Sequence, residues 1–220
     1  ASAETLRRQI IDEFPDGDHI GSAEDLQDRF QVSGPTVRQA MRILEAEGLI
    51  RVRRGNNGGF FAGTPSVDVV SRSASALLRR QGADLADLVA ASQLIGPEVG
   101  RRAPGTPDTA PRRRLLEFAE QEWDDDVEVS VPDATRIAVR FGRLLGELCG
   151  SPSLALITDM LSDLVINLMT QTIQDYDPEV LAGYITLIRE GHRRLARAVA
   201  EGDAVTAHAA QADMDRIVEL

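Results

Sequence analysis

Four polar side chains recur along one predicted helix at a spacing that suits an anionic partner. The polar positions of residues 34–47 include Thr36, Arg38, Gln39 and Arg42. The apolar positions follow an i, i+3, i+4, i+7 pattern and are Val37, Ala40, Met41 and Leu44. Such a pattern predicts a helix with one buried face and one polar face. Arginine, threonine and glutamine side chains bind phosphates and base edges when a helix enters a DNA major groove. The alternative is that Arg38 and Arg42 are ordinary solvated charges.

The residues before and after this segment predict a helix–turn–helix. Ser22, with Asp25 three positions later, fits a capping box at the start of a helix that runs to about residue 30. Ser33 is placed to cap the second helix, and Gly48 to end it. A helix over residues 2–14 would complete a three-helix core.

A glycine-rich hairpin follows the second helix. Residues 49–53 and 60–61 predict two strands, and the glycine-rich residues 55–59 predict the turn between them. This completes a winged helix–turn–helix over residues 1–63. Its candidate DNA-contacting residues are Ser33, Thr36, Arg38, Gln39, Arg42, Arg54, Asn56 and Gly58.

The charge distribution supports this interpretation despite a net charge of −11 over 220 residues. Residues 29–54 hold six arginines against Glu45 and Glu47, a local charge of +4. Nucleic-acid binding depends on where positive charge lies rather than on the total. The acidic remainder of the chain is expected to face away from DNA.

Composition narrows the class of protein further. Aromatic residues make up only 4%, so the core must be aliphatic. Strand-forming runs are almost absent outside the hairpin, so we expect mostly helix. The single cysteine, Cys149, excludes an internal disulfide and a cysteine-based zinc site. We expect no apolar run close to the length of a membrane span and find no signal-peptide pattern. The sequence therefore predicts a cytoplasmic protein without a membrane partner.

Composition changes after residues 64–68, which we predict to be a linker. The remaining residues, 69–220, predict an all-helical bundle, so the fold is expected to be mainly α. The expected helices cover residues 66–80, 84–102, 107–129, 133–149, 151–174, 177–201 and 203–220. No nucleophile elbow, phosphate loop or catalytic triad spacing occurs, which argues against an enzyme.

Residues 1–63 resemble the DNA-binding domain of GntR-type transcriptional regulators. The matching residues are Ser22, Asp25-Leu26, Val32-Ser33, 37–40, 44–49, 53–55 and Gly58-Gly59. The later helices resemble the effector domain of the FadR-like (FCD) subfamily through Leu85 and Leu88, Pro97-Glu98, 141–154 and 192–203. The resemblance implies a homodimer that binds an operator in double-stranded DNA and a small-molecule effector.

Four positions depart from the family pattern. Glu24 and Gly34 stand where relatives often have arginine, so two phosphate contacts are expected to be lost. Many FCD domains bind a divalent metal through an Asp and a His four residues apart and two later histidines. Ala138 and Gly142 occupy the first two positions, and only His192 matches the third. The fourth falls near Asp213 or Met214. We therefore expect no metal or other cofactor, and extra space in the bundle.

Several polar residues are candidates for contacting the effector, which we expect to be a carboxylate. The candidates are His192, Asn167, Thr170, Arg140 and Asp213. Four of them have a structural alternative: His192 could be a hydrogen-bonded residue of a metal-free cavity, Asn167 and Thr170 could link helices, and Arg140 could be surface charge. Asp159 and Asp163 fit a solvated face better than a carboxylate pair.

The sequence thus supports a transcriptional repressor that senses a small molecule. The alternative is an interaction or scaffold protein whose winged helix no longer reads DNA, which the net charge, Glu24 and Gly34 would explain. An enzyme within the helical region is the least favoured hypothesis.

Overall fold

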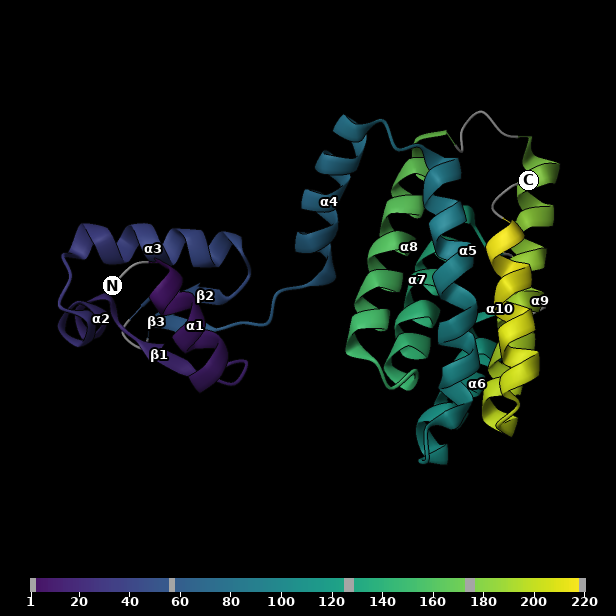
Figure 1. The fold of residues 1–220 in the computed structure, drawn as a ribbon, viewed down its shortest axis with the longest axis horizontal. Coiled ribbons are helices and arrows are strands. Elements are labelled where there is room, and N and C mark those ends of the chain that lie inside the picture. Colours follow the sequence, from purple (N-terminus) through teal and green to yellow (C-terminus); the bar gives the residue numbers. More distant parts are fainter. Residues whose placement is uncertain (1–2, 56–57, 125–128, 173–176, 218–220) are drawn as a thin grey trace. The chain divides into compact units, whose positions relative to one another are not determined.

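The computed structural model describes residues 3–55, 58–124, 129–172 and 177–217. By its internal contacts the chain divides into two compact units, Ala1–Val70 and Ser71–Leu220. The first contains a small sheet and three helices, and the second is entirely helical in its described residues (Figure 1).

The first unit packs three helices around an aliphatic core. The helices are α1 (Ala3–Glu13), α2 (Ala23–Phe30) and α3 (Gly34–Ala46). Their buried side chains include Leu6, Ile10, Leu26, Val37, Met41 and Leu44. The apolar stripe predicted along α3 is therefore the face that α3 buries.

The predicted caps of these helices are confirmed. The Ser22 hydroxyl accepts a hydrogen bond from the Asp25 N–H at 3.1 Å, and the Asp25 carboxylate accepts one from the Ser22 N–H at 2.7 Å. The Ser33 hydroxyl accepts from the Thr36 N–H at 3.4 Å. Gly48 follows α3 with a φ of +76°, a conformation that glycine adopts without strain.

A three-stranded antiparallel sheet of order β1-β3-β2 adjoins the helices. Strands β2 (Ile50–Arg53) and β3 (Gly59–Ala62) form the predicted hairpin, with Val52 opposite Phe60. Strand β1 (His19–Gly21) pairs with β3 through His19 and Phe61. The sequence did not reveal β1, because three residues are too few to show alternation.

Seven α-helices and a short 3₁₀ turn form most of the rest of the described chain. They are α4 (Val67–Gln81), α5 (Leu85–Arg102), η1 (Ala103–Gly105), α6 (Thr109–Glu122), α7 (Val131–Leu148), α8 (Pro152–Thr172), α9 (Pro178–Glu201) and α10 (Ala204–Ile217). Helix α6 ends at Glu122 rather than near residue 129 as predicted. The chain leaves the helix at Trp123, whose φ and ψ are −106° and 44°.

Helices α5 to α10 lie side by side in a bundle (Figure 1). Helix α5 packs against α8 and α10, α9 packs against α6 and α10, and α7 packs against α8. One core cluster is built around Phe141, Leu195 and Val199, and another around Leu88 and Leu164.

Helix α8 differs from the expectation that no apolar run approaches the length of a membrane span. The stretch Pro152–Thr170 has a mean hydropathy of 1.4 and is long enough to span a membrane. Core helices of bundles meet the same criterion, and α8 packs on α5 and α7. Length and composition therefore give only weak support for a membrane segment.

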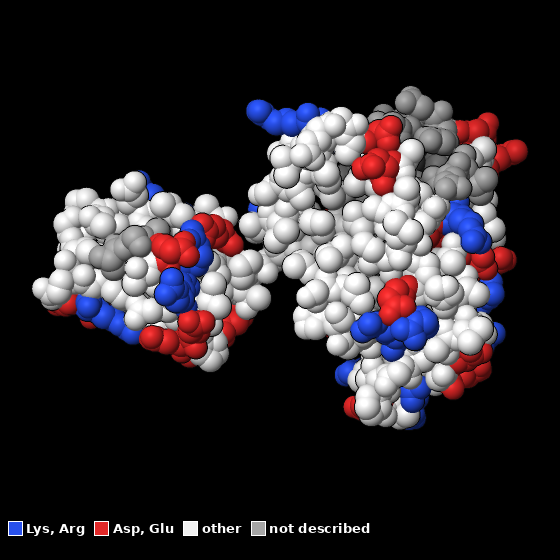
Figure 2. Space-filling view, viewed as in Figure 1, with Lys and Arg blue, Asp and Glu red and all other residues white. Residues whose placement is uncertain are grey.

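On the face of this unit drawn in Figure 2, charged side chains form small clusters separated by uncharged surface.

Candidate functional site

The polar face of α3 is exposed, as the sequence predicted. Thr36, Arg38, Gln39 and Arg42 all lie on the surface. In the described part of the chain, neither Arg38 nor Arg42 has an ion-pair partner, so both guanidinium groups can bind an anion. The hydroxyl groups of Ser33 and Thr36 lie 2.8 Å apart at the start of α3. This end of the helix therefore offers hydroxyls and backbone N–H groups beside two arginines.

All three arginines of the wing are exposed, and two of them also contact other side chains. Arg51 pairs with Asp16 at 2.5 Å, and the Arg53 guanidinium lies 4.2 Å from the centre of the Phe61 ring. Arg54 is exposed at the start of the turn. A Cβ at Gly58 would lie 2.6 Å from the Arg53 carbonyl oxygen, so only glycine fits there. Asn56 lies outside the described residues.

Gly34 has a local role that the sequence did not reveal. A Cβ at this position would lie 2.9 Å from Gln27 Oε1 and 3.2 Å from Arg38 Nη1. An arginine at this position would have to displace both side chains. Gly34 therefore lacks the arginine side chain that was expected to contact a phosphate, but it leaves room for the side chain of Arg38.

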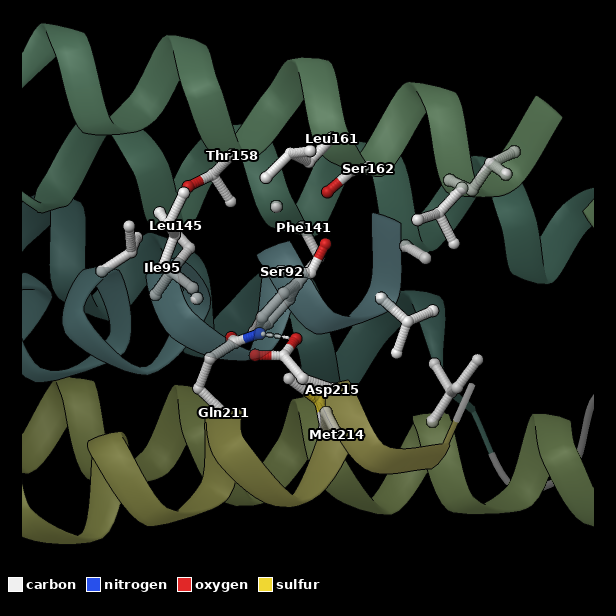
Figure 3. A pocket seen from close by; sticks show the side chains of 18 of the residues that line it. Ser92, Ile95, Phe141, Leu145, Thr158, Leu161, Ser162, Gln211, Met214 and Asp215 are labelled. Carbon is white, nitrogen blue, oxygen red and sulfur yellow. Dashed lines mark hydrogen bonds between the residues drawn. The ribbon is translucent and has the colours of Figure 1, made fainter. Parts of the chain in front are cut away.

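The second unit contains a cavity of about 170 Å³ between α5, α7, α8, α9 and α10. Its lining is mostly apolar, with polar groups from Ser92, Thr158, Ser162, Tyr184, His192, Gln211 and Asp215. Ala138 and Gly142, the two vacated metal positions, also line it. A Cβ built on Gly142 would meet no atom within 4 Å, so the small residue contributes open space. Figure 3 shows the side chains that enclose this space.

His192 lies in the cavity wall with a fixed orientation. Only 6% of its surface is exposed. The Trp123 indole N–H donates to His192 Nδ1 at 2.9 Å, and the imidazole stacks on Phe141 with ring centres 4.0 Å apart. Burial lowers the pKa of His192 to about 3, so the ring is neutral at physiological pH. Because Nδ1 accepts a hydrogen bond, the ring proton is on Nε2.

Asp215 places a carboxyl group in the cavity wall, and one of its two oxygens is buried without a hydrogen-bond partner in the described structure. Its Oδ1 accepts a hydrogen bond from the Gln211 side chain at 2.9 Å, whereas its Oδ2 is buried and has no partner in the described structure. Burial raises the pKa of Asp215 to about 7. A Cβ at Gly96 would overlap this carboxyl group, so Gly96 leaves room for it on α5.

The residues present do not fit the metal site of FCD relatives. Ala138 and Gly142 have no ligand atoms. The Trp123 hydrogen bond places a proton on His192 Nε2, so this nitrogen has no lone pair for a metal. Within the described ranges, no group of three or more His, Cys, Asp or Glu side chains could hold an ion.

Of the five predicted effector-binding residues, the structure brings only His192 to the main cavity. Arg140 pairs with Glu122 at 2.7 Å on the surface, and Asp213 pairs with Arg194 at 2.8 Å. Asn167 is exposed. Thr170 lines a smaller cavity of about 40 Å³, and its hydroxyl donates to the Ile166 carbonyl at 2.7 Å.

Sequence reasoning missed Asp215 and Trp123. The fourth metal position was predicted near Asp213 or Met214, and Asp215 follows these two residues on α10. The Gln211–Asp215 spacing of four residues was a usable signal, since it puts both side chains on one helix face. Trp123 carried no periodic signal because it follows the end of α6.

Comparison with known proteins assigns both units. Residues 2–61 match the model of the family described as bacterial regulatory proteins, gntR family, and residues 87–216 match the FCD domain model. The chain is 24% identical to the HTH-type transcriptional regulator LutR of Bacillus subtilis (strain 168), over 90% of this chain and 88% of that protein. The solved structure described as Streptococcus agalactiae GntR covers 98% of this chain and 96% of its own, with a TM-score of 0.74 and 20% identity, which shows a shared fold.

Proposed function

The chain belongs to the GntR family of bacterial regulatory proteins and carries an FCD domain, and from this premise we propose that it is a metal-independent, effector-controlled transcriptional repressor. Two copies would form a homodimer in the cytoplasm. Each α3 would enter a major groove of a pseudo-palindromic operator. The cavity of the second unit would bind a small molecule.

One observation carries the DNA-binding part of this proposal. Arg38 and Arg42 are exposed one helical turn apart on α3, and neither has an ion-pair partner in the described structure, while the opposite face of the helix is buried. Residues i and i+4 lie on the same helix face, so both arginines can reach one stretch of DNA. Thr36 and Gln39 would add contacts to base edges, and Arg54, Gly58 and Asn56 would contact the backbone from the wing.

The regulatory part rests on the cavity among the helices. A ligand there changes DNA affinity only if it binds the DNA-competent and DNA-free arrangements with different affinities. The sequence suggested a carboxylate effector, with Arg140 as one candidate partner and surface charge as its alternative. Arg140 pairs with Glu122 outside the cavity, so the effector class has to be inferred from the residues that line it.

The experiment is a fluorescence anisotropy titration of the full chain against the DNA upstream of its own gene. We expect salt-sensitive binding, because arginines that neutralise phosphates release counterions. A scaffold protein with the same winged helix would show no preference for this fragment over unrelated DNA of equal length. In a reporter strain, deletion of a repressor should raise expression from the same fragment, and an unchanged or lower level would oppose repression.

A further inference from the structure

The cavity has an unusual charge balance for a carboxylate sensor. Among the described residues that line it, Asp215 is the only one with a carboxyl group, and neither lysine nor arginine contributes to the wall. His192 is held neutral by burial, with its Nδ1 occupied by Trp123. A carboxylate ligand would therefore lie near an acidic group with no cation to compensate. Burying such a charge without a partner is strongly unfavourable.

The unpaired oxygen of Asp215 favours a ligand that donates hydrogen bonds. Oδ2 is buried and has no partner in the described structure, whereas Oδ1 is satisfied by Gln211. An unsatisfied buried acceptor costs free energy, so a donor supplied by a ligand recovers that cost. A positively charged donor recovers more, because it also stabilises the ionised carboxylate.

A second unpaired group lies on the opposite wall. Thr158 Oγ1 on α8 is also buried without a partner in the described structure. Figure 3 shows Thr158 on α8 and Asp215 on α10, on opposite sides of the cavity, with Leu161, Leu145 and Phe141 between or beside them. Thr158 and Asp215 thus present two polar atoms, unpartnered in the described structure, from opposite walls of a cavity that is mostly apolar.

We propose that this cavity binds a small, mainly apolar primary amine, whose ammonium group donates to Asp215 Oδ2. The apolar part would lie against Leu145, Leu161 and Val165, and a polar group at its far end could reach Thr158. The volume of about 170 Å³ suits a ring with a short substituent, since a cavity of about 150 Å³ accommodates benzene. The inference rests on the proposed function only in treating the cavity as the effector site.

The test compares three probes of nearly equal shape: benzylamine, benzyl alcohol and benzoate. Calorimetry at neutral pH gives their affinities for the full chain. Trp123 is the only tryptophan and contacts His192 in the cavity wall, so its fluorescence provides a second readout at the site. We expect benzylamine to bind at least about tenfold more tightly than benzyl alcohol, from a charge-assisted hydrogen bond. Benzoate should bind more weakly than either.

Two variants test whether the amine binds in this cavity, and a third serves as a control for loss of a carboxylate elsewhere. Asp215→Asn should reduce benzylamine binding to the level of benzyl alcohol and leave the alcohol unchanged. Gly142→Leu should abolish binding of both, because its side chain would fill the open space beside Gly142. Glu190→Gln removes an exposed carboxylate on α9 and should change neither. Circular dichroism and melting of each variant separate loss of binding from loss of fold.

Three outcomes would overturn the proposal. They are benzoate binding as tightly as benzylamine, benzylamine affinity unaffected by Asp215→Asn in a folded variant, and no binding of any probe at millimolar concentration. Failure of the proposed function looks different. In that case benzylamine binds in an Asp215-dependent manner, but operator affinity is absent or does not respond to the amine, which supports the ligand class and contradicts the effector role.

Discussion

The indole N–H of Trp123 lies 2.9 Å from His192 Nδ1, and this single hydrogen bond determines which nitrogen of His192 carries the ring proton. A histidine that binds a metal needs a free lone pair on one ring nitrogen. Here Nδ1 accepts from Trp123 and Nε2 carries the proton, so neither nitrogen has a free lone pair. Together with Ala138 and Gly142, which have no ligand atoms, the Trp123–His192 pair leaves the cavity without the donor set of the family's metal site.

Replacing Trp123 by phenylalanine removes this donor and tests its role. We expect the unfolding free energy to fall by about 1–2 kcal/mol, because a buried hydrogen bond is lost and His192 Nδ1 is left without its partner. Nitrogen NMR shifts of His192 should report protonation on Nε2 in the wild type and a mixture of tautomers in Trp123→Phe. Identical His192 shifts in the two proteins would show that Trp123 does not set the tautomer.

The pH dependence of stability should reveal the buried carboxyl group of Asp215. Its pKa is raised to about 7 in the folded protein from 3.8. Between these values the folded state holds a proton that the unfolded state has lost. The unfolding free energy therefore falls as pH rises through this window, by at most about 4 kcal/mol, since one pKa unit corresponds to about 1.4 kcal/mol.

The comparison with Asp215→Asn isolates this contribution. His192 acts in the opposite direction, because a histidine whose pKa is lowered to about 3 on folding costs stability as pH falls below 6.5. Both proteins share that effect, so it cancels in their difference. Urea denaturation at several pH values should show the variant gaining stability relative to the wild type as pH rises from about 4 to 7. A difference that does not change with pH would contradict the burial of an ionisable Asp215.

Two glycine-to-alanine substitutions should have opposite effects on stability. At Gly142 a Cβ meets no atom within 4 Å, so Gly142→Ala should stabilise α7 by about 0.5–1 kcal/mol through helix propensity. At Gly100 a Cβ would lie 2.9 Å from the carbonyl oxygen of Ala207, so Gly100→Ala should destabilise the α5–α10 packing. The melting temperature should rise for Gly142→Ala and fall for Gly100→Ala relative to the wild type. A lower melting temperature for Gly142→Ala would mean that the space beside Gly142 is filled.

Features encoded by local spacing could be predicted from the sequence, whereas features created by long-range packing could not. The Ser22–Asp25 capping box and the buried stripe of α3 depend on residues within one or two helical turns, and both were predicted correctly. The Trp123–His192 bond joins residues 69 positions apart, and no local pattern specifies it.

The effector site illustrates the same distinction within one helix. Asp213 and Asp215 are both acidic residues of α10, but a helix turns by about 100° per residue, so two positions apart they face in very different directions. Asp213 pairs with Arg194 on the surface, whereas Asp215 lines the cavity. The spacing of Gln211 and Asp215 places both on one face, but contacts with α5 and α9 decide which face of the helix lines the cavity.

The central claim, that the exposed face of α3 binds operator DNA, is tested most directly by measuring how operator affinity depends on salt for Arg38→Ala/Arg42→Ala. The matched control is Arg113→Ala/Arg114→Ala, which removes two exposed arginines from α6. We expect the α3 variant to lose at least about tenfold in affinity and the slope of log K against log salt to become shallower by about 2, one unit for each lost phosphate contact. The control should match the wild type. If the α3 variant kept the affinity and the salt slope of the wild type, the claim that α3 binds operator DNA would be contradicted.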